Sequence, residues 1–172
     1  MISEGLSQLG INVYYHTVVG DNPQRVRQAV EIARQRADIL ITTGGLGPTC
    51  DDLTKVAIAQ AFGKELVFHQ ESAQRIRDRF AAMGRPITEN NYQQAMLPEG
   101  ATVFPNDIGT APGCGVRTAS GKVIVMLPGP PSELVPMLQH YVVPFLKEGS
   151  HAVIHSCMIR TFGLGEGAGA LK

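Results

Sequence analysis

The segment ITTGGLGPTCDDLT, residues 41–54, joins a glycine-rich turn to the start of a predicted helix. Gly44, Gly45 and Gly47 permit positive φ angles and a close backbone approach, so their amide N–H groups can point at an anion. The helix that follows adds the positive end of its dipole. A phosphate group is the ligand that such a turn suits.

Asp51 and Asp52 stand at the same helix start, where they would repel a bare anion. Because Mg²⁺ is bound by one or two carboxylates together with substrate phosphates, we expect both aspartates to hold a divalent cation against a phosphate. In one alternative, Asp51 or Asp52 orients an attacking water as a general base. In another, Asp52 only caps the helix. The residue types alone leave these roles open.

Other chemically useful residues follow the neighbouring predicted strands. Ligands gather at the carboxyl ends of parallel strands, so we expect four loops along one edge of the sheet. The PNDIGTAPG loop supplies Asn106, Asp107 and Thr110 for a sugar or a base, although such a loop can also be only a turn. The PGPPSEL corner supplies Gly129, Pro130 and Glu133. The four loops are residues 20–22, 44–52, 105–113 and 128–133.

Composition excludes several classes of protein. The 172 residues contain 15 Lys+Arg and 15 Asp+Glu, and this zero net charge offers no field for nucleic acid or a membrane surface. Three cysteines without CxxC spacing suggest neither a disulfide framework nor a zinc site. We therefore expect a soluble, cytoplasmic protein. Arg75, Arg77 and Arg79 are expected to form a solvated helix face, and Cys50 is assigned no role.

The elements that must position these loops alternate between strands and helices. The pattern predicts a three-layer α/β/α sandwich with a mostly parallel mixed sheet. Strands are expected at residues 13–19, 38–43, 101–104, 114–118, 122–127 and 151–162. Helices are expected at residues 2–9, from 23, at 53–62, 72–83 and 88–96, and from the PGPPSEL corner to about residue 146.

Four motifs in order, GGLGPTCDDLT, ENNYQQAMLPEGA, PNDIGTAPG and MLPGPPSEL, resemble the N-terminal domain of the competence/damage-inducible protein CinA family. That domain shares the molybdopterin-binding fold of the MoaB and MogA proteins. The similarity runs from about residue 2 to residue 162. Family members open with a strand and a GTELL-type motif, so the first strand is expected to be missing. Residues 1–149 would then form the domain, and residues 150–172 would start a small α/β region.

The resemblance implies metal-dependent cleavage of ADP-ribose to AMP and ribose 5-phosphate, in a domain that is often a homo-oligomer. It assigns catalysis and metal binding to Asp51 and Asp52. It assigns the first alternative function, molybdopterin binding with adenylyl transfer, to the same edge. A non-catalytic binding or oligomerisation module is the second alternative. The residues expected to bind substrate phosphate or its nucleotide are Gly44, Gly45, Gly47, Thr49, Thr54, Asn106, Gly129, Pro130 and Glu133.

Overall fold

The computed structural model describes residues 1–148, and the strand and small region expected beyond them lie outside the described residues. The helices are α1 (Ile2–Ser7), α2 (Pro23–Arg36), α3 (Thr54–Ala61), α4 (Gln70–Ala82), the 3-10 segment η1 (Glu89–Ala95), α5 (Pro131–Met137), the π-helical turn η2 (Leu138–Val142) and α6 (Val143–Lys147). The strands are β1 (Ile39–Thr43), β2 (Leu66–Phe68), β3 (Met96–Pro98), β4 (Thr102–Phe104), β5 (Gly113–Arg117) and β6 (Val123–Leu127).

The main sheet has the strand order β1-β6-β5-β4. β1 pairs with β6 in parallel, whereas the β6–β5 and β5–β4 pairs are antiparallel. The expected mixed sheet is confirmed, but its parallel part is smaller than expected within the described residues. The reason is the tight turn at residues 118–122, which makes β5 and β6 a hairpin and thereby reverses β5.

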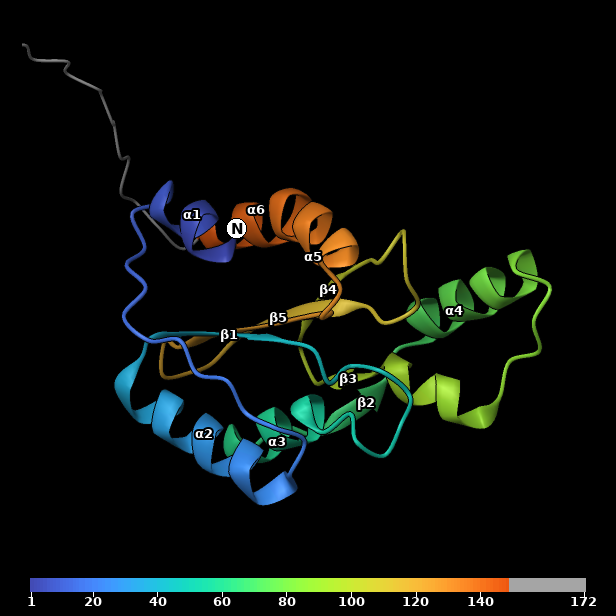
Figure 1. The fold of residues 1–172 in the computed structure, drawn as a ribbon, viewed down its shortest axis with the longest axis horizontal. Coiled ribbons are helices and arrows are strands. Elements are labelled where there is room, and N and C mark those ends of the chain that lie inside the picture. Colours follow the sequence, from blue (N-terminus) through green and yellow to red (C-terminus); the bar gives the residue numbers. More distant parts are fainter. Residues whose placement is uncertain (149–172) are drawn as a thin grey trace, which may run out of the picture.

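Helices cover both faces of this sheet, which gives the expected three layers (Figure 1). α1, α5 and α6 lie on one face, and α2 and α3 lie on the other. β6 shows why both faces must be covered: Val123, Val125 and Leu127 belong to one core cluster, while Ile124 and Met126 belong to the other. A strand that is apolar on both faces is typical of the centre of a layered α/β sheet.

The strand expected at residues 13–19 is wrong: the described structure assigns no strand there. Tyr14, Tyr15 and Val18 are exposed, so the apolar side chains that suggested a strand pack against no sheet face. A run of β-branched and aromatic residues becomes a strand only when a neighbouring backbone pairs with it. The short antiparallel pair β2–β3 was not expected from the sequence.

The C-terminal helical region begins at the proline-rich corner and continues through α5, η2 and α6. Pro136 and Pro144 lie within it and lack backbone N–H groups. The π-helical turn lies between the two prolines and keeps the chain helical. The single helix expected from the PGPPSEL corner to about residue 146 thus consists of three consecutive helical segments.

Two glycines of β5 bring this helical region close to the sheet. A Cβ on Gly113 would lie 2.4 Å from Met137 Sδ and 2.9 Å from the Met126 carbonyl oxygen. A Cβ on Gly115 would lie 2.6 Å from a ring carbon of Phe145. Since real Cβ contacts are not this short, the absence of side chains at Gly113 and Gly115 fixes how closely α5 and α6 approach.

Candidate functional site

A cavity of about 400 Å³ opens where three of the four expected loops meet. The loop at residues 20–22 contributes nothing to it among the described residues. Helix α4 and η1, which the sequence did not place at this edge, contribute instead. The lining residues are Gly44, Gly45, Leu46, Gly47, Asp52, Arg79, Met83, Gln94, Ile108, Gly109, Thr110, Ala111, Pro128, Gly129, Pro130 and Glu133.

The glycine-rich turn continues directly from β1. Gly44 N donates to the Leu127 carbonyl at 2.9 Å, which ties the turn to the end of β6. Gly44 and Gly45 have φ angles of 84° and 68°, a conformation that favours glycine. Gly129 packs against the Gly44 backbone, so the turn and the proline corner are neighbours, as expected. A Cβ on Gly45 would lie 2.1 Å from Thr54 Oγ1, so this glycine makes room for that hydroxyl group.

Asp52 is held by its own loop. Its Oδ2 accepts hydrogen bonds from Thr49 N at 2.9 Å and Thr49 Oγ1 at 2.7 Å. Partial burial raises the pKa of Asp52, but hydrogen bonds from Thr49 and the Gly47 backbone, with the charge of Lys55, outweigh burial and bring it below its ordinary value. The helix-capping alternative is wrong, because the N-cap of α3 is Leu53 and has no side-chain hydrogen bond.

Lys55 is buried close to Asp52, with only 5% of its surface exposed. Its Nζ donates to the carbonyl oxygens of Gln93 at 2.7 Å and Gln94 at 3.2 Å, which ties α3 to the end of η1. Burial lowers the pKa of Lys55 to about 8, although Cys114 and Asp52 oppose this effect. Burial also raises the pKa of the neighbouring Cys114 thiol to about 12.

Glu133 stands in the first turn of α5 and forms another part of the cavity wall. Its Oε2 accepts a hydrogen bond from Asn106 Nδ2 at 2.7 Å. Asn106 also donates to the Ala111 carbonyl, and its Oδ1 accepts from the amides of Ile108 and Gly109. Asn106 is therefore a scaffold that organises its own loop and orients Glu133.

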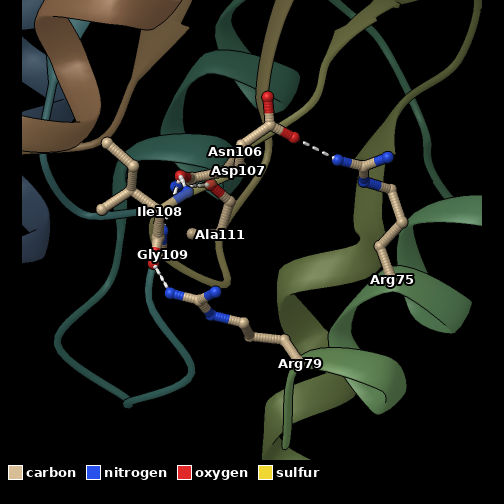
Figure 2. Close-up of polar contacts among 7 residues, drawn as sticks. All are labelled: Arg75, Arg79, Asn106, Asp107, Ile108, Gly109 and Ala111. Atoms are coloured by element: carbon tan, nitrogen blue, oxygen red, sulfur yellow. Dashed lines mark hydrogen bonds and ion pairs between the residues drawn. The ribbon is translucent and has the colours of Figure 1, made fainter. Parts of the chain in front are cut away.

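Two arginines of α4, exposed to solvent as expected, also contact the same loop. Figure 2 shows Arg75 paired with Asp107, at 2.5 Å, and Arg79 donating to the Ile108 carbonyl. Arg77 does not contact this loop: it donates to Gln74 on the helix surface. Arg75 and Arg79 are four residues apart and therefore lie on the same face of α4, the face toward residues 106–111. Arg77 lies on a different face and does not reach that loop.

The structure separates the two aspartates that the sequence paired. Asp52 lines the cavity, whereas Asp51 is exposed and is not among the lining residues. Of the other expected residues, Gly44, Gly45, Gly47, Gly129, Pro130 and Glu133 line the cavity. Thr49, Thr54 and Asn106 act one step behind it, through Asp52, Gly45 and Glu133 respectively.

Sequence reasoning missed Gln94 and Arg79. The sequence around them shows no local pattern that indicates a site. They lie on α4 and η1, which approach the cavity only through tertiary packing. Only the ENNYQQA segment, quoted for the family resemblance, contained a signal that could have drawn attention to Gln94. Within residues 1–148, no group of three or more His, Cys, Asp or Glu side chains could by itself hold a metal ion.

The fold and site define an α/β domain with a cavity at the sheet edge, lined by a glycine-rich turn and two separated carboxylates. Residues 1–148 match the family described as "Probable molybdopterin binding domain". The chain belongs to this family. Within the described residues, no helix is long and apolar enough to cross a membrane.

Sequence relatives confirm the resemblance to CinA. Over 165 residues the chain is 51% identical to a CinA-like protein of Dictyoglomus thermophilum, an alignment covering 96% of the chain and 40% of that protein. A CinA-like protein of Dictyoglomus turgidum gives the same identity and coverage. The chain thus spans 40% of the length of these relatives.

Solved structures confirm the fold. A CinA protein from Thermoplasma acidophilum superposes with a TM-score of 0.74 at 28% identity, covering 86% of this chain and 84% of that one. A molybdenum cofactor biosynthesis protein B gives a TM-score of 0.53 at 22% identity, covering 86% of this chain and 79% of that one. The second likeness concerns the fold alone.

Proposed function

We propose that this domain hydrolyses the pyrophosphate bond of ADP-ribose, with a divalent cation, to give AMP and ribose 5-phosphate. One observation carries the proposal: a single cavity combines the glycine-rich turn that follows β1 with two fixed carboxylates, Asp52 and Glu133. The backbone amides of a glycine-rich turn favour a phosphate. Fixed carboxylates near a phosphate suit a cation or an attacking water.

The two carboxylates differ in the chemistry they favour. Asp52 has a lowered pKa, so it stays ionised and is a weak proton acceptor. It therefore suits contact with a cation that neutralises the diphosphate charge when bound. Glu133, oriented by Asn106, is left as the acceptor of the proton from the attacking water. The water oxygen bonds to one phosphorus, the bond from that phosphorus to the bridging oxygen breaks, and the second phosphate leaves.

This assignment replaces the expected Asp51–Asp52 pair with Asp52 and Glu133. The donor set fits Mg²⁺, which keeps several waters and needs only one or two protein carboxylates beside substrate phosphates. A site built entirely from protein ligands is not required. The missing three-carboxylate cluster among residues 1–148 is therefore compatible with the proposal.

The alternative function is binding of a molybdopterin-type ligand, with or without adenylyl transfer. It is favoured by the family description and by the shared fold of the MoaB-type structure. Such a ligand also carries a phosphate, so the glycine-rich turn would serve it equally. The test must therefore detect hydrolysis rather than phosphate binding alone.

The decisive experiment incubates the purified chain with ADP-ribose and Mg²⁺ and quantifies AMP, with and without a chelator. Asp52→Asn keeps an acceptor for Thr49 but removes the charge, and we expect it to lose roughly 100-fold or more of the activity. Glu133→Gln should do the same. Asp51→Asn is the matched control and should stay close to the parent. Absence of metal-dependent AMP release by the parent would refute the proposal.

We further propose that the chain forms a homo-oligomer, as the resemblance implies. β1 is an edge strand of the described sheet, and exposed edges favour pairing with another chain. Exposed Tyr14 and Val18 add apolar surface in the segment before α2. Light scattering should give more than the mass of one chain, and a monomer at micromolar concentration would contradict this.

A further inference from the structure

Gln94 is a buried polar residue whose side chain is incompletely satisfied. It is 3% exposed, and its Oε1 has no hydrogen-bond partner among the described residues. The other buried polar side chains differ: Lys55 donates to two carbonyls, and Ser72 hydrogen-bonds with His69. A buried acceptor without a partner costs stability, so its retention calls for an explanation.

The position of Gln94 is fixed by its surroundings. Its backbone carbonyl accepts from buried Lys55, and the next residue, Ala95, is fully buried. Gln94 lines the same cavity as Asp52 and Glu133. The unpaired acceptor therefore belongs to a rigid part of the cavity wall rather than to a mobile surface side chain.

The cavity also has an apolar portion. Met83 and Ile108 line it although 43% and 46% of their surfaces are exposed, and Leu46 adds a buried apolar side chain. Exposed apolar side chains in a cavity wall gain from covering a flat ring. Backbone amides of the glycine-rich turn serve a phosphate, so the cavity suits a ligand with a phosphate at one end and a planar ring at the other.

We propose that Gln94 is a specificity-determining residue whose Oε1 accepts a hydrogen bond from a ring-bound N–H group of a phosphorylated ligand. This inference rests on the proposed function, since it concerns the base of the same nucleotide. A site built to accept a hydrogen bond discriminates strongly against an analogue that lacks the donor, because its own acceptor is then left buried and unpaired. Both a nucleobase and a pterin ring carry such a group.

The test compares ligand pairs that differ by one amino group, using calorimetry in the presence of Mg²⁺. The first pair is AMP and purine riboside 5′-monophosphate, which lacks the amino group. The second pair is GMP and IMP, whose rings share with a pterin the adjoining amide N–H and differ in the 2-amino group. We expect the parent to favour the amino-bearing member of one pair by roughly tenfold or more. The pair that shows the preference tells which ring the cavity takes.

Gln94→Met keeps the length of the side chain and removes the amide. It should bind both members of that pair equally, bind ribose 5-phosphate as the parent does, and melt no lower than the parent without ligand. Gln94→Glu retains an acceptor and should retain the preference. Gln93→Met, at the exposed neighbouring position, is the matched control and should behave as the parent.

The outcomes separate this inference from the proposed function. A parent that binds nucleotides with no preference in either pair, or a preference unchanged in Gln94→Met, would overturn the role of Gln94 alone. A Gln94→Met protein that melts well below the parent would assign Gln94 a structural role and overturn the inference. A parent that binds none of these phosphates would overturn both the inference and the proposed function.

Discussion

Asp52 and Glu133 line one cavity but are held in different ways. Asp52 is held by its own loop: its carboxylate accepts two hydrogen bonds from Thr49, three residues earlier in the chain, and one from the Gly47 backbone. Glu133 is held by Asn106, which is 27 residues away and is itself embedded in a loop supported from α4. Each carboxylate also lies against a glycine: a Cβ on Gly47 would lie 2.5 Å from Asp52 Oδ2, and one on Gly109 would lie 2.1 Å from Glu133 Oε2. One carboxylate is thus held at the cavity wall by residues close to it in sequence, and the other by tertiary contacts.

The largest expected effect comes from adding a methyl group at either glycine. Neither Gly47 nor Gly109 has a positive φ angle, so alanine is compatible with the backbone, but the facing carboxylate must move. A shift of about 1 Å in a reacting group can cost roughly 100-fold in rate. We expect Gly47→Ala and Gly109→Ala to lose AMP release on this scale while melting close to the parent. Gly20→Ala, at an open position, is the control. Full activity in both variants would show that neither carboxylate takes part.

Substitution of Asn106, which supports Glu133, should destabilise the protein more than substitution of Thr49, which supports Asp52. Asn106→Ala leaves the amides of Ile108 and Gly109 and the carbonyl of Ala111 without their partner, so we expect a loss of about 2–3 kcal/mol in unfolding free energy. Thr49→Val removes one hydrogen bond but keeps the Thr49 amide, and should cost about 0.5–1.5 kcal/mol. Urea denaturation measures both. Equal losses would contradict the distinction between local and tertiary support.

The buried amine behind Asp52 should give stability a distinctive pH dependence. Lys55 has a pKa of about 8 in the folded chain against 10.5 in the unfolded chain, so the unfolded state binds more protons between these values and stability rises with pH. Cys114 has a pKa of about 12 against 9.0, so stability falls as pH rises above 9.

We therefore expect the unfolding free energy to increase from pH 8 to 9, by at most about 1.4 kcal/mol, and then to level off. Urea denaturation across pH 7.5–10 measures this profile. Lys55→Met should abolish the rise, and Cys114→Ala should extend it above pH 9. A parent profile that is flat from pH 8 to 9 would contradict the buried position of the amine.

The smallest effect is expected at the outer support of the Glu133 loop. Arg75 and Asp107 form an ion pair with side chains 46% and 68% exposed, and such pairs contribute about 0–1 kcal/mol. Arg75→Gln should lower the melting temperature only slightly, and less still at high salt. Arg77→Gln, on the same helix but not facing the loop, is its control. A large loss of AMP release in Arg75→Gln would show that the loop depends on this pair.

The same contrast explains what the sequence could predict. The glycine-rich turn, Asp52 and the strands expected at residues 114–118 and 122–127 follow from local residue types, and the structure confirms them. Gln94 and Arg79 were missed because their approach to the cavity depends on how α4 and η1 pack, which no spacing along the chain reveals. The strand predicted at residues 13–19 was wrong because local β propensity does not supply a neighbouring strand to pair with.

The two glycines of β5 have a consequence for how this domain can diversify. Gly113 sets how closely α5 approaches the sheet and Gly115 how closely α6 does, and α5 carries Glu133 on its first turn. A larger residue at Gly113 would push α5 outward and carry one catalytic candidate away from the other. The range of ligands that the cavity accepts can therefore change without substitution of any residue that lines it. A change in the volume of one β5 side chain in the core would be enough.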